Sequence, residues 1–160
     1  MSPGAMLDGA DEGALQAFLG GLPQAHIVPV RTLAHAWQAA GGFLQVGRVT
    51  VRLGVRNREG RPFTAATLHA NLGGDRPAAR AADLRSGPAL EVARVLLANH
   101  GLGEADWRGW CDDLADLQLV GFDVAAKYPA IALERLPDPA LARLAQSLRD
   151  LGRLAQGQAA

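Results

Sequence analysis

The 160-residue chain has the length of one ordinary domain, and with 49% hydrophobic and 20% charged residues it is expected to bury a core. Its single cysteine excludes an internal disulfide, and no apolar run reaches the roughly 18 residues that span a bilayer. These features predict a cytoplasmic protein without a membrane partner. The formal net charge of zero excludes a uniformly basic or acidic protein.

The charge is unevenly distributed along the chain. Residues 1–30 hold three acids and no base, giving −3, and residues 31–100 hold ten arginines against four acids, giving +6. Residues 101–160 hold six bases against nine acids, giving −3. The basic middle is therefore where an anionic partner would be sought.

Two helices are predicted before the basic region. Asp11 is expected to cap a helix that ends near Leu19, and a second helix is expected over 32–40. The stretch 23–30 between them, PQAHIVPV, is predicted to be extended.

A β-hairpin is predicted from the alternation of apolar residues with arginine at every fourth position, Arg48, Arg52 and Arg56. An even-numbered loop at Asn57-Arg58-Glu59-Gly60 would pair Val51 with Ala66, Val49 with Leu68, Arg48 with His69 and Arg56 with Arg61. An odd-numbered loop would instead place the leucines of the second strand opposite the arginines. The hydrophobic pattern favours the even loop.

That register sets two like charges against each other, because Arg56 would lie opposite Arg61. The repulsion would be offset by Glu59 in the turn, by solvent, by acids elsewhere in the fold, or by an external polyanion. The arginine face is therefore the main candidate site.

The second half is predicted to be mostly helical. After an exposed loop at 73–88, a helix is expected from residue 87 to 101 with Pro88 in its first turn. A helix near 104–118 places Trp107, Trp110, Cys111, Leu114 and Leu117 on one stripe. The segment 119–137 is left open between strand and helix.

The C-terminal helix is predicted to begin with Asp138 as cap and Pro139 at the first helical position. The fold class is α+β: a small antiparallel sheet built on the hairpin, extended by strands from 24–30 or 129–136, with helices on one face. One domain is expected over 1–155, with a flexible tail at 156–160.

Signatures of enzyme chemistry are absent from the sequence. No P-loop, dinucleotide fingerprint or G-x-S-x-G motif occurs, and His26, His35, His69 and His100 lack metal-ligand spacing. Cys111 lies on an apolar stripe, which favours core packing over catalysis. Asp112, Asp113 and Asp116 favour a solvated acidic face over a cation site. The sequence thus predicts no cofactor or metal and favours a binding protein over an enzyme.

The predicted function is contact with DNA or RNA phosphates, because arginine, histidine and asparagine gather on the hairpin and in the following loop. The candidate residues are Arg48, Arg52, Arg56, Arg58, Arg61, His69, Asn71, Arg76 and Arg80. Apart from Phe63 near the turn, aromatic residues are missing from this face, so binding would depend on phosphates and on salt.

The alternative is a small homo-oligomeric adaptor or chaperone-like protein that binds an acidic partner. Its second candidate surface is a leucine stripe on the C-terminal helix, which would self-associate or take a partner helix if it did not dock on its own core. The stripe consists of Leu141, Leu144, Leu148 and Leu151.

Overall fold

A computed structural model of the chain describes residues 3–71, 87–119, 122–134 and 136–158. The helices and strands of this part are, in chain order, α1 (Pro3–Gly20), α2 (Gln24–Ala39), β1 (Phe43–Val46), β2 (Thr50–Arg56), β3 (Pro62–His69), β4 (Ala89–Val92), α5 (Arg94–Asn99), α6 (Glu104–Leu114), the 3₁₀ turn η1 (Ala115–Leu117), β5 (Ala130–Ala132) and α7 (Asp138–Ala155).

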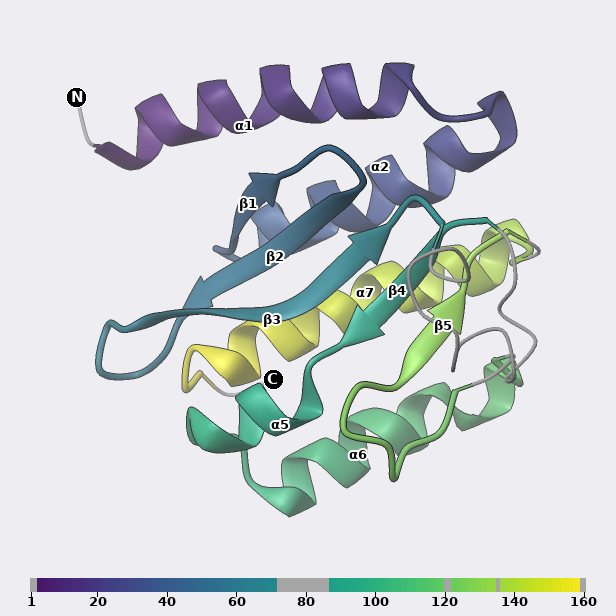
Figure 1. The fold of residues 1–160 in the computed structure, drawn as a ribbon. Helices are drawn as coiled ribbons and strands as arrows, with labels where there is room; N and C mark the ends of the chain where they lie inside the picture. The colour runs from purple at the N-terminus through teal and green to yellow at the C-terminus, as the bar shows by residue number, and fades with distance from the viewer. Residues whose placement is uncertain (1–2, 72–86, 120–121, 135, 159–160) are drawn as a thin grey trace.

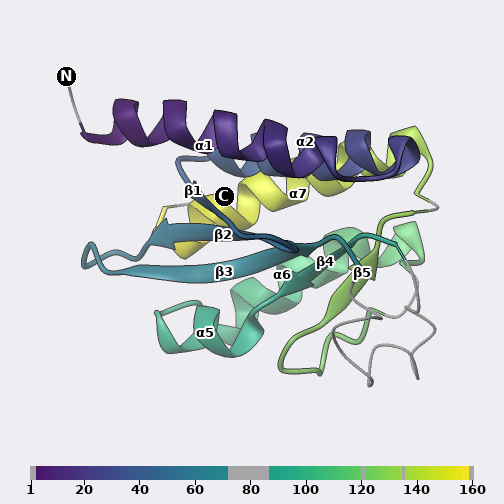
Figure 2. The ribbon, with the colours of Figure 1, turned by 45° about the horizontal axis from the view of Figure 1, so that its top comes forward.

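The described strands form one antiparallel sheet in the order β1-β2-β3-β4-β5, so each strand pairs with its neighbours in sequence. Figure 1 shows this meander, and Figure 2 shows α1, α2 and α7 together above the sheet, with α5 below it. The predicted α+β class with an antiparallel sheet is confirmed. Helices were expected on one face, but α5 lies on the side of the sheet opposite α1, α2 and α7.

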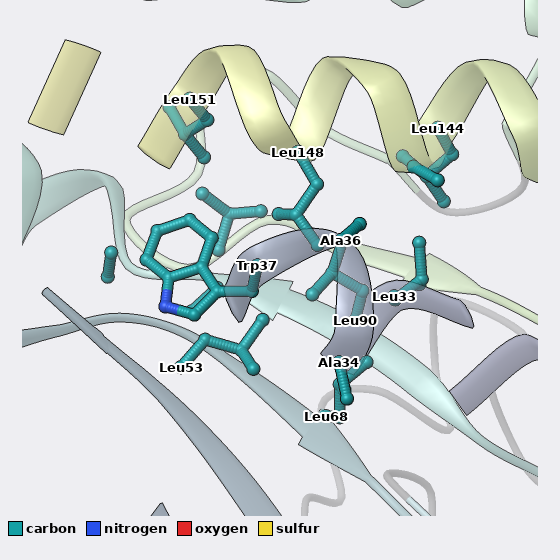
Figure 3. Packing of buried hydrophobic residues seen from close by; sticks show 14 of the residues in the cluster. Leu33, Ala34, Ala36, Trp37, Leu53, Leu68, Leu90, Leu144, Leu148 and Leu151 are labelled. Atoms are coloured by element: carbon teal, nitrogen blue, oxygen red, sulfur yellow. The ribbon is translucent and has the colours of Figure 1, made fainter. Parts of the chain in front are cut away.

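The core lies between the sheet and helices α2 and α7. The indole of Trp37 in α2 is fully buried beside Leu53 of β2 and Leu148 and Leu151 of α7 (Figure 3). Trp37 Nε1–H donates to the carbonyl oxygen of Gly54 at 2.7 Å. A buried carbonyl needs such a partner, so this bond ties α2 to β2.

Two glycines leave room for this indole. A Cβ on Gly42 would lie 2.2 Å from Trp37 Nε1, and a Cβ on Gly152 would lie 3.3 Å from the far edge of the ring. Any side chain at residue 42 would therefore displace a tightly packed and hydrogen-bonded ring.

The first two helices are longer than predicted. Helix α1 begins at Pro3 rather than being capped by Asp11, whose carboxylate instead accepts a hydrogen bond from Leu44 N–H of edge strand β1 at 3.1 Å. The stretch 24–30 is helical and supplies no strand, although it contains Pro29. An interior proline costs about 3 kcal/mol. Burial of Val30 and Leu33 on the same face as Trp37 offsets this cost.

The predicted helix over 87–101 is wrong in its first half. Residues 89–92 form β4, whose side chains are all buried, and only 94–99 form a helix, α5. Leu90 pairs with Leu68 on one side and with Ile131 of β5 on the other. A short apolar run suits a buried strand as well as a helix, so periodicity alone could not distinguish them.

The predicted register of the hairpin is also wrong. Asn57 N–H donates to Arg61 O and Gly60 N–H donates to Asn57 O, both at 2.9 Å, which closes an odd, three-residue loop. Gly60 adopts φ +83°, as such loops require. Arg56 consequently pairs with Pro62 and not with Arg61.

A β-bulge at Ala65 then restores the alternation. The ladder passes from Gly54–Thr64 to Leu53–Ala66, which leaves Ala65 as the extra residue. Its carbonyl accepts a hydrogen bond from Ala93 N–H at 2.8 Å. Beyond the bulge, the register differs by two residues from the expected one.

The corrected pairs are Val51–Leu68 and Thr50–His69, replacing the expected Val51–Ala66, Val49–Leu68 and Arg48–His69. Val51, Leu53 and Val55 are buried while Arg52 and Arg56 are exposed, as predicted. Val49 is 45% exposed and lies with Arg48 in the turn between β1 and β2, outside the strand.

The remaining elements agree more closely with the sequence. Helix α6 buries Trp107, Trp110, Cys111 and Leu114 and exposes its aspartates. Strand β5 falls within the segment left open, in the expected range 129–136. Helix α7 begins one residue early, since Asp138 is its first residue and Pro137 its cap, without a side-chain capping bond.

We expect Gly42→Ala to destabilise the fold by about 2–3 kcal/mol, because the new methyl group would overlap Trp37 where the ring has no space to move. Urea unfolding followed by tryptophan fluorescence measures this change. The matched control is Gly109→Ala, at an exposed position of α6 where a Cβ would meet nothing within 4 Å. It should raise stability by about 0.5–1 kcal/mol. Equal effects of the two substitutions would contradict the role given to Gly42.

Candidate functional site

The five hairpin arginines are all exposed but do not form one continuous row. Arg52 and Arg56 project from β2, and Arg58 and Arg61 lie in the turn that follows it. Arg48 lies in the β1–β2 turn, at the opposite end of β2. Arg56, Arg58 and Arg61 thus lie together at the end of the hairpin and are here called the basic tip. Arg52 lies further along β2, four residues before Arg56 and on the same face. In Figures 1 and 2 this end of the hairpin extends past the neighbouring ends of α5 and α7.

The backbone of the basic tip is organised by Asn57, which is 5% exposed. Its Oδ1 accepts hydrogen bonds from the backbone N–H groups of Glu59 at 3.0 Å and Arg61 at 2.9 Å. These bonds satisfy two donors that would otherwise be unpaired in a short loop.

The C-terminal ends of α5 and α7 both contact the loop of the basic tip through hydrogen bonds. Asn57 Nδ2 lies 2.9 Å from Nδ1 of His100, which follows α5, and the His100 ring stacks on Phe63 of β3 with centroids 4.0 Å apart and planes at 3°. Arg58 donates to the carbonyl of Gly157, just beyond α7, at 3.1 Å. The hairpin end is therefore tied to both helices that flank it.

Little negative charge offsets the arginines. Glu59 lies 3.8 Å from Arg61, and both side chains are largely exposed, so this ion pair contributes little. Among the described residues, Arg56 donates to the carbonyl of Gly60 at 3.0 Å and to no carboxylate. Within the ranges that the structure describes, no carboxylate lies within 4 Å of Arg48, Arg52, Arg56 or Arg58.

The acidic helix α6 does not neutralise the hairpin. Asp116 of η1, directly after this helix, pairs with Arg143 of α7, whose guanidinium lowers the pKa of that carboxyl. Glu104, at the start of α6, holds Arg94 at 3.1 Å and Arg108 at 3.3 Å. Asp116 and Glu104 therefore form ion pairs with arginines that lie outside the hairpin.

Other predicted site residues are not part of this group. His69 is 5% exposed and lies 3.4 Å from Glu91, which is 6% exposed, so its ring is not available to a phosphate at the surface. Asn71 is exposed directly after β3. Arg76 and Arg80 lie outside the described residues.

The leucine stripe of α7 faces the chain's own core. Each of its residues is at most 6% exposed, and α7 packs against α2, α6 and β2. These leucines are not on the surface of the single chain, so they offer no exposed stripe to a partner helix. They are Leu141, Leu144, Leu148 and Leu151.

A cavity of about 460 Å³ lies between α6 and residues 118–119 and 122–125. Its walls include Trp107, Phe122 and Cys111, and Arg94 stacks over the Trp107 ring at 5.6 Å. Trp107 Nε1–H and Arg94 both donate to the carbonyl of Val124, so these two donors of the wall already have a partner. Burial raises the pKa of the Cys111 thiol to about 11, which keeps it protonated near neutral pH.

Two further features bear on the class of protein. Among the described residues, no group of three or more histidine, cysteine or acidic side chains is arranged to hold a metal ion. None of the helices in the described part of the chain combines the length and hydropathy needed to cross a membrane.

Comparisons with known proteins give no family for this chain. No protein-family model matches it, and neither the curated proteins nor the solved structures yielded a significant match. Any proposal about function therefore depends on the geometry described above.

Sequence reasoning did not identify Asn57, Phe63 and His100 as a unit. Asn57 was recognisable as a turn residue and His100 as a residue at a helix end. Their contact depends on α5 packing beside β3, and no local sequence signal predicts that packing.

We expect Cys111 to react very slowly with thiol reagents in the folded protein, because the thiolate is the reactive form. The labelling rate should rise with pH until it levels off above a pKa of about 11. This folded-state pKa lies above the ordinary value of 9.0. The buried thiol's contribution to the free energy of unfolding is therefore fully present below pH 9.0, where both states are protonated. It is lost as the pH rises from 9.0 through about 11, because the unfolded chain gives up its proton first. Labelling in urea provides the unfolded reference. Rapid labelling of the native protein at neutral pH would contradict the burial of Cys111.

Proposed function

We propose that the protein binds the phosphate backbone of a nucleic acid through the basic tip and Arg52. The observation that carries the proposal is that Arg52, Arg56 and Arg58 are exposed at a hydrogen-bonded hairpin end and have no carboxylate partner among the described residues. Guanidinium groups donate two parallel hydrogen bonds to phosphate oxygens and stay charged at all physiological pH values. Duplex DNA or RNA offers the dense array of phosphates that such a group would recognise.

The balance of charge supports a polyanion. The basic tip holds three arginines and one acid, Glu59, whose ion pair with Arg61 is weak because both side chains are exposed. A polyanion that binds here gains from the release of its condensed counterions. Its phosphates compete with the weak Arg61–Glu59 ion pair and with the hydrogen bonds from Arg56 and Arg58 to backbone carbonyls.

The surroundings favour backbone contact over stacking on bases. Phe63, the aromatic residue nearest the turn, is only 9% exposed and lies against the His100 ring. Proteins that grip single strands present aromatic rings on which bases stack. Without an exposed ring among the described residues of the hairpin end, binding would depend on phosphates and would carry little sequence specificity.

The double variant Arg52→Glu, Arg56→Glu should weaken binding of a fluorescein-labelled DNA duplex by about tenfold or more, because two phosphate contacts become repulsive. The slope of log K against log salt should become shallower by about 0.9 per lost contact, hence by about two units in total. Fluorescence anisotropy at several salt concentrations measures both quantities.

The matched control is Arg31→Glu, Arg149→Glu, which changes the net charge by the same amount on helices α2 and α7. It should leave both the affinity and the slope nearly unchanged. Equal loss in the two double variants would mean that only net charge matters. If the wild-type chain fails to bind duplex but binds an acidic polypeptide such as polyglutamate, the nucleic-acid proposal is wrong and an acidic protein partner replaces it.

A further inference from the structure

We infer that Asn57 and His100 are positioning residues for the basic tip, and that His100 performs this role as the neutral tautomer with its proton on Nε2. The inference deepens the proposed function and rests on it for the link to binding. The inference rests on the hydrogen bonds of the Asn57 side chain, whose oxygen accepts from the loop backbone and whose nitrogen faces His100.

The orientation of the Asn57 amide is fixed by its backbone partners. The N–H groups of Glu59 and Arg61 both point at one atom of the amide, at 3.0 and 2.9 Å. Two donors require an acceptor, so this atom is the oxygen. The amide nitrogen therefore faces His100.

The protonation of His100 follows from that orientation. Asn57 Nδ2 can only donate, and it lies 2.9 Å from His100 Nδ1. Nδ1 must then accept the hydrogen bond and carry no proton, which places the ring proton on Nε2. The opposite tautomer would set two N–H groups against each other.

The ring itself is held in place by the rest of the fold. It stacks on Phe63, three degrees from parallel, and the backbone N–H of His100 donates to Leu96 O at 3.0 Å at the end of α5. Leu97 anchors α5 in the core with 1% exposure. The contact thus transmits the position of α5 to the hairpin.

The Asn57–His100 contact positions the arginines indirectly, by fixing the backbone of the loop that carries them. Arg56 and Arg58 are the direct neighbours of Asn57, and Arg61 donates its N–H to the Asn57 side chain. A fixed loop presents these guanidinium groups from fixed points, so less conformational entropy is lost when they contact phosphates. Releasing the loop should weaken binding without changing its charge.

The test compares two substitutions of His100. Asn at residue 100 can place its side-chain oxygen where Nδ1 lies and so retain an acceptor, whereas Phe retains a ring for stacking but has no acceptor. We expect His100→Phe to weaken binding of the labelled DNA duplex by about five- to tenfold. His100→Asn should bind within about twofold of the wild-type chain.

Two NMR measurements report on the brace without any nucleic acid. Long-range ¹H–¹⁵N correlations of the His100 ring should show the Nε2–H tautomer, and amide exchange at Glu59 and Arg61 should be slow in the wild-type chain and in His100→Asn but faster in His100→Phe. A ring protonated on Nδ1, or exchange that is the same in all three proteins, overturns the inference.

The outcomes separate the two proposals. If the wild-type chain binds duplex and all His100 variants bind equally, the positioning role is wrong while the proposed function stands. If the wild-type chain does not bind duplex, the proposed function fails and the role in binding fails with it. If His100→Phe loses affinity for the duplex while His100→Asn keeps it, both the proposed function and the positioning role are supported.

Discussion

The fold depends on the buried indole of Trp37, which joins α2, β2 and α7. Its N–H group donates to Gly54, the residue at which the register of β2 against β3 shifts, so the irregular point of the ladder is tied directly to a helix. Gly42 and Gly152 leave space on either side of the ring. Because the ring is fully buried and hydrogen-bonded to Gly54, it links β2 to α2 where both pack against α7. The face of β2 that carries Arg52 and Arg56 is turned outward as a result.

Two irregularities in the hairpin compensate for each other. The three-residue loop shifts the pairing by one residue, which alone would turn the apolar residues of β3 to the arginine side, and the bulge at Ala65 shifts it by one more. The buried alternation of β2 survives, and Arg56 lies opposite Pro62. The expected repulsion between Arg56 and Arg61 is therefore absent. The case for a polyanion depends instead on guanidinium groups that have no carboxylate partner in the described part of the chain.

The charged side chains near α6 and those at the hairpin end have different surroundings. At α6 and the following turn η1, arginines and acids neutralise one another within the fold: Glu104 pairs with Arg94, and Asp116 pairs with Arg143. At the hairpin end, the polar groups that organise the loop are amide, carbonyl and imidazole, which fix the backbone without neutralising it. A loop held by groups that carry no negative charge keeps its arginines available to a partner, and this is the physical basis of the proposed function.

The sequence by itself determined the α+β class, the amphipathic helices α6 and α7 and the buried and exposed alternation of β2, because each follows from a local period of apolar residues. It did not determine the helix through Pro29, the strand at 89–92 or the register of the hairpin. In each case tertiary burial outweighed a local preference: the core offsets the cost of Pro29, and pairing with β3 and β5 made a strand of an apolar run. The arginines of the candidate site were recognisable from their spacing. Their bracing by Asn57 and His100 was decided only in three dimensions, because those residues are 43 positions apart and meet only when α5 packs on the sheet.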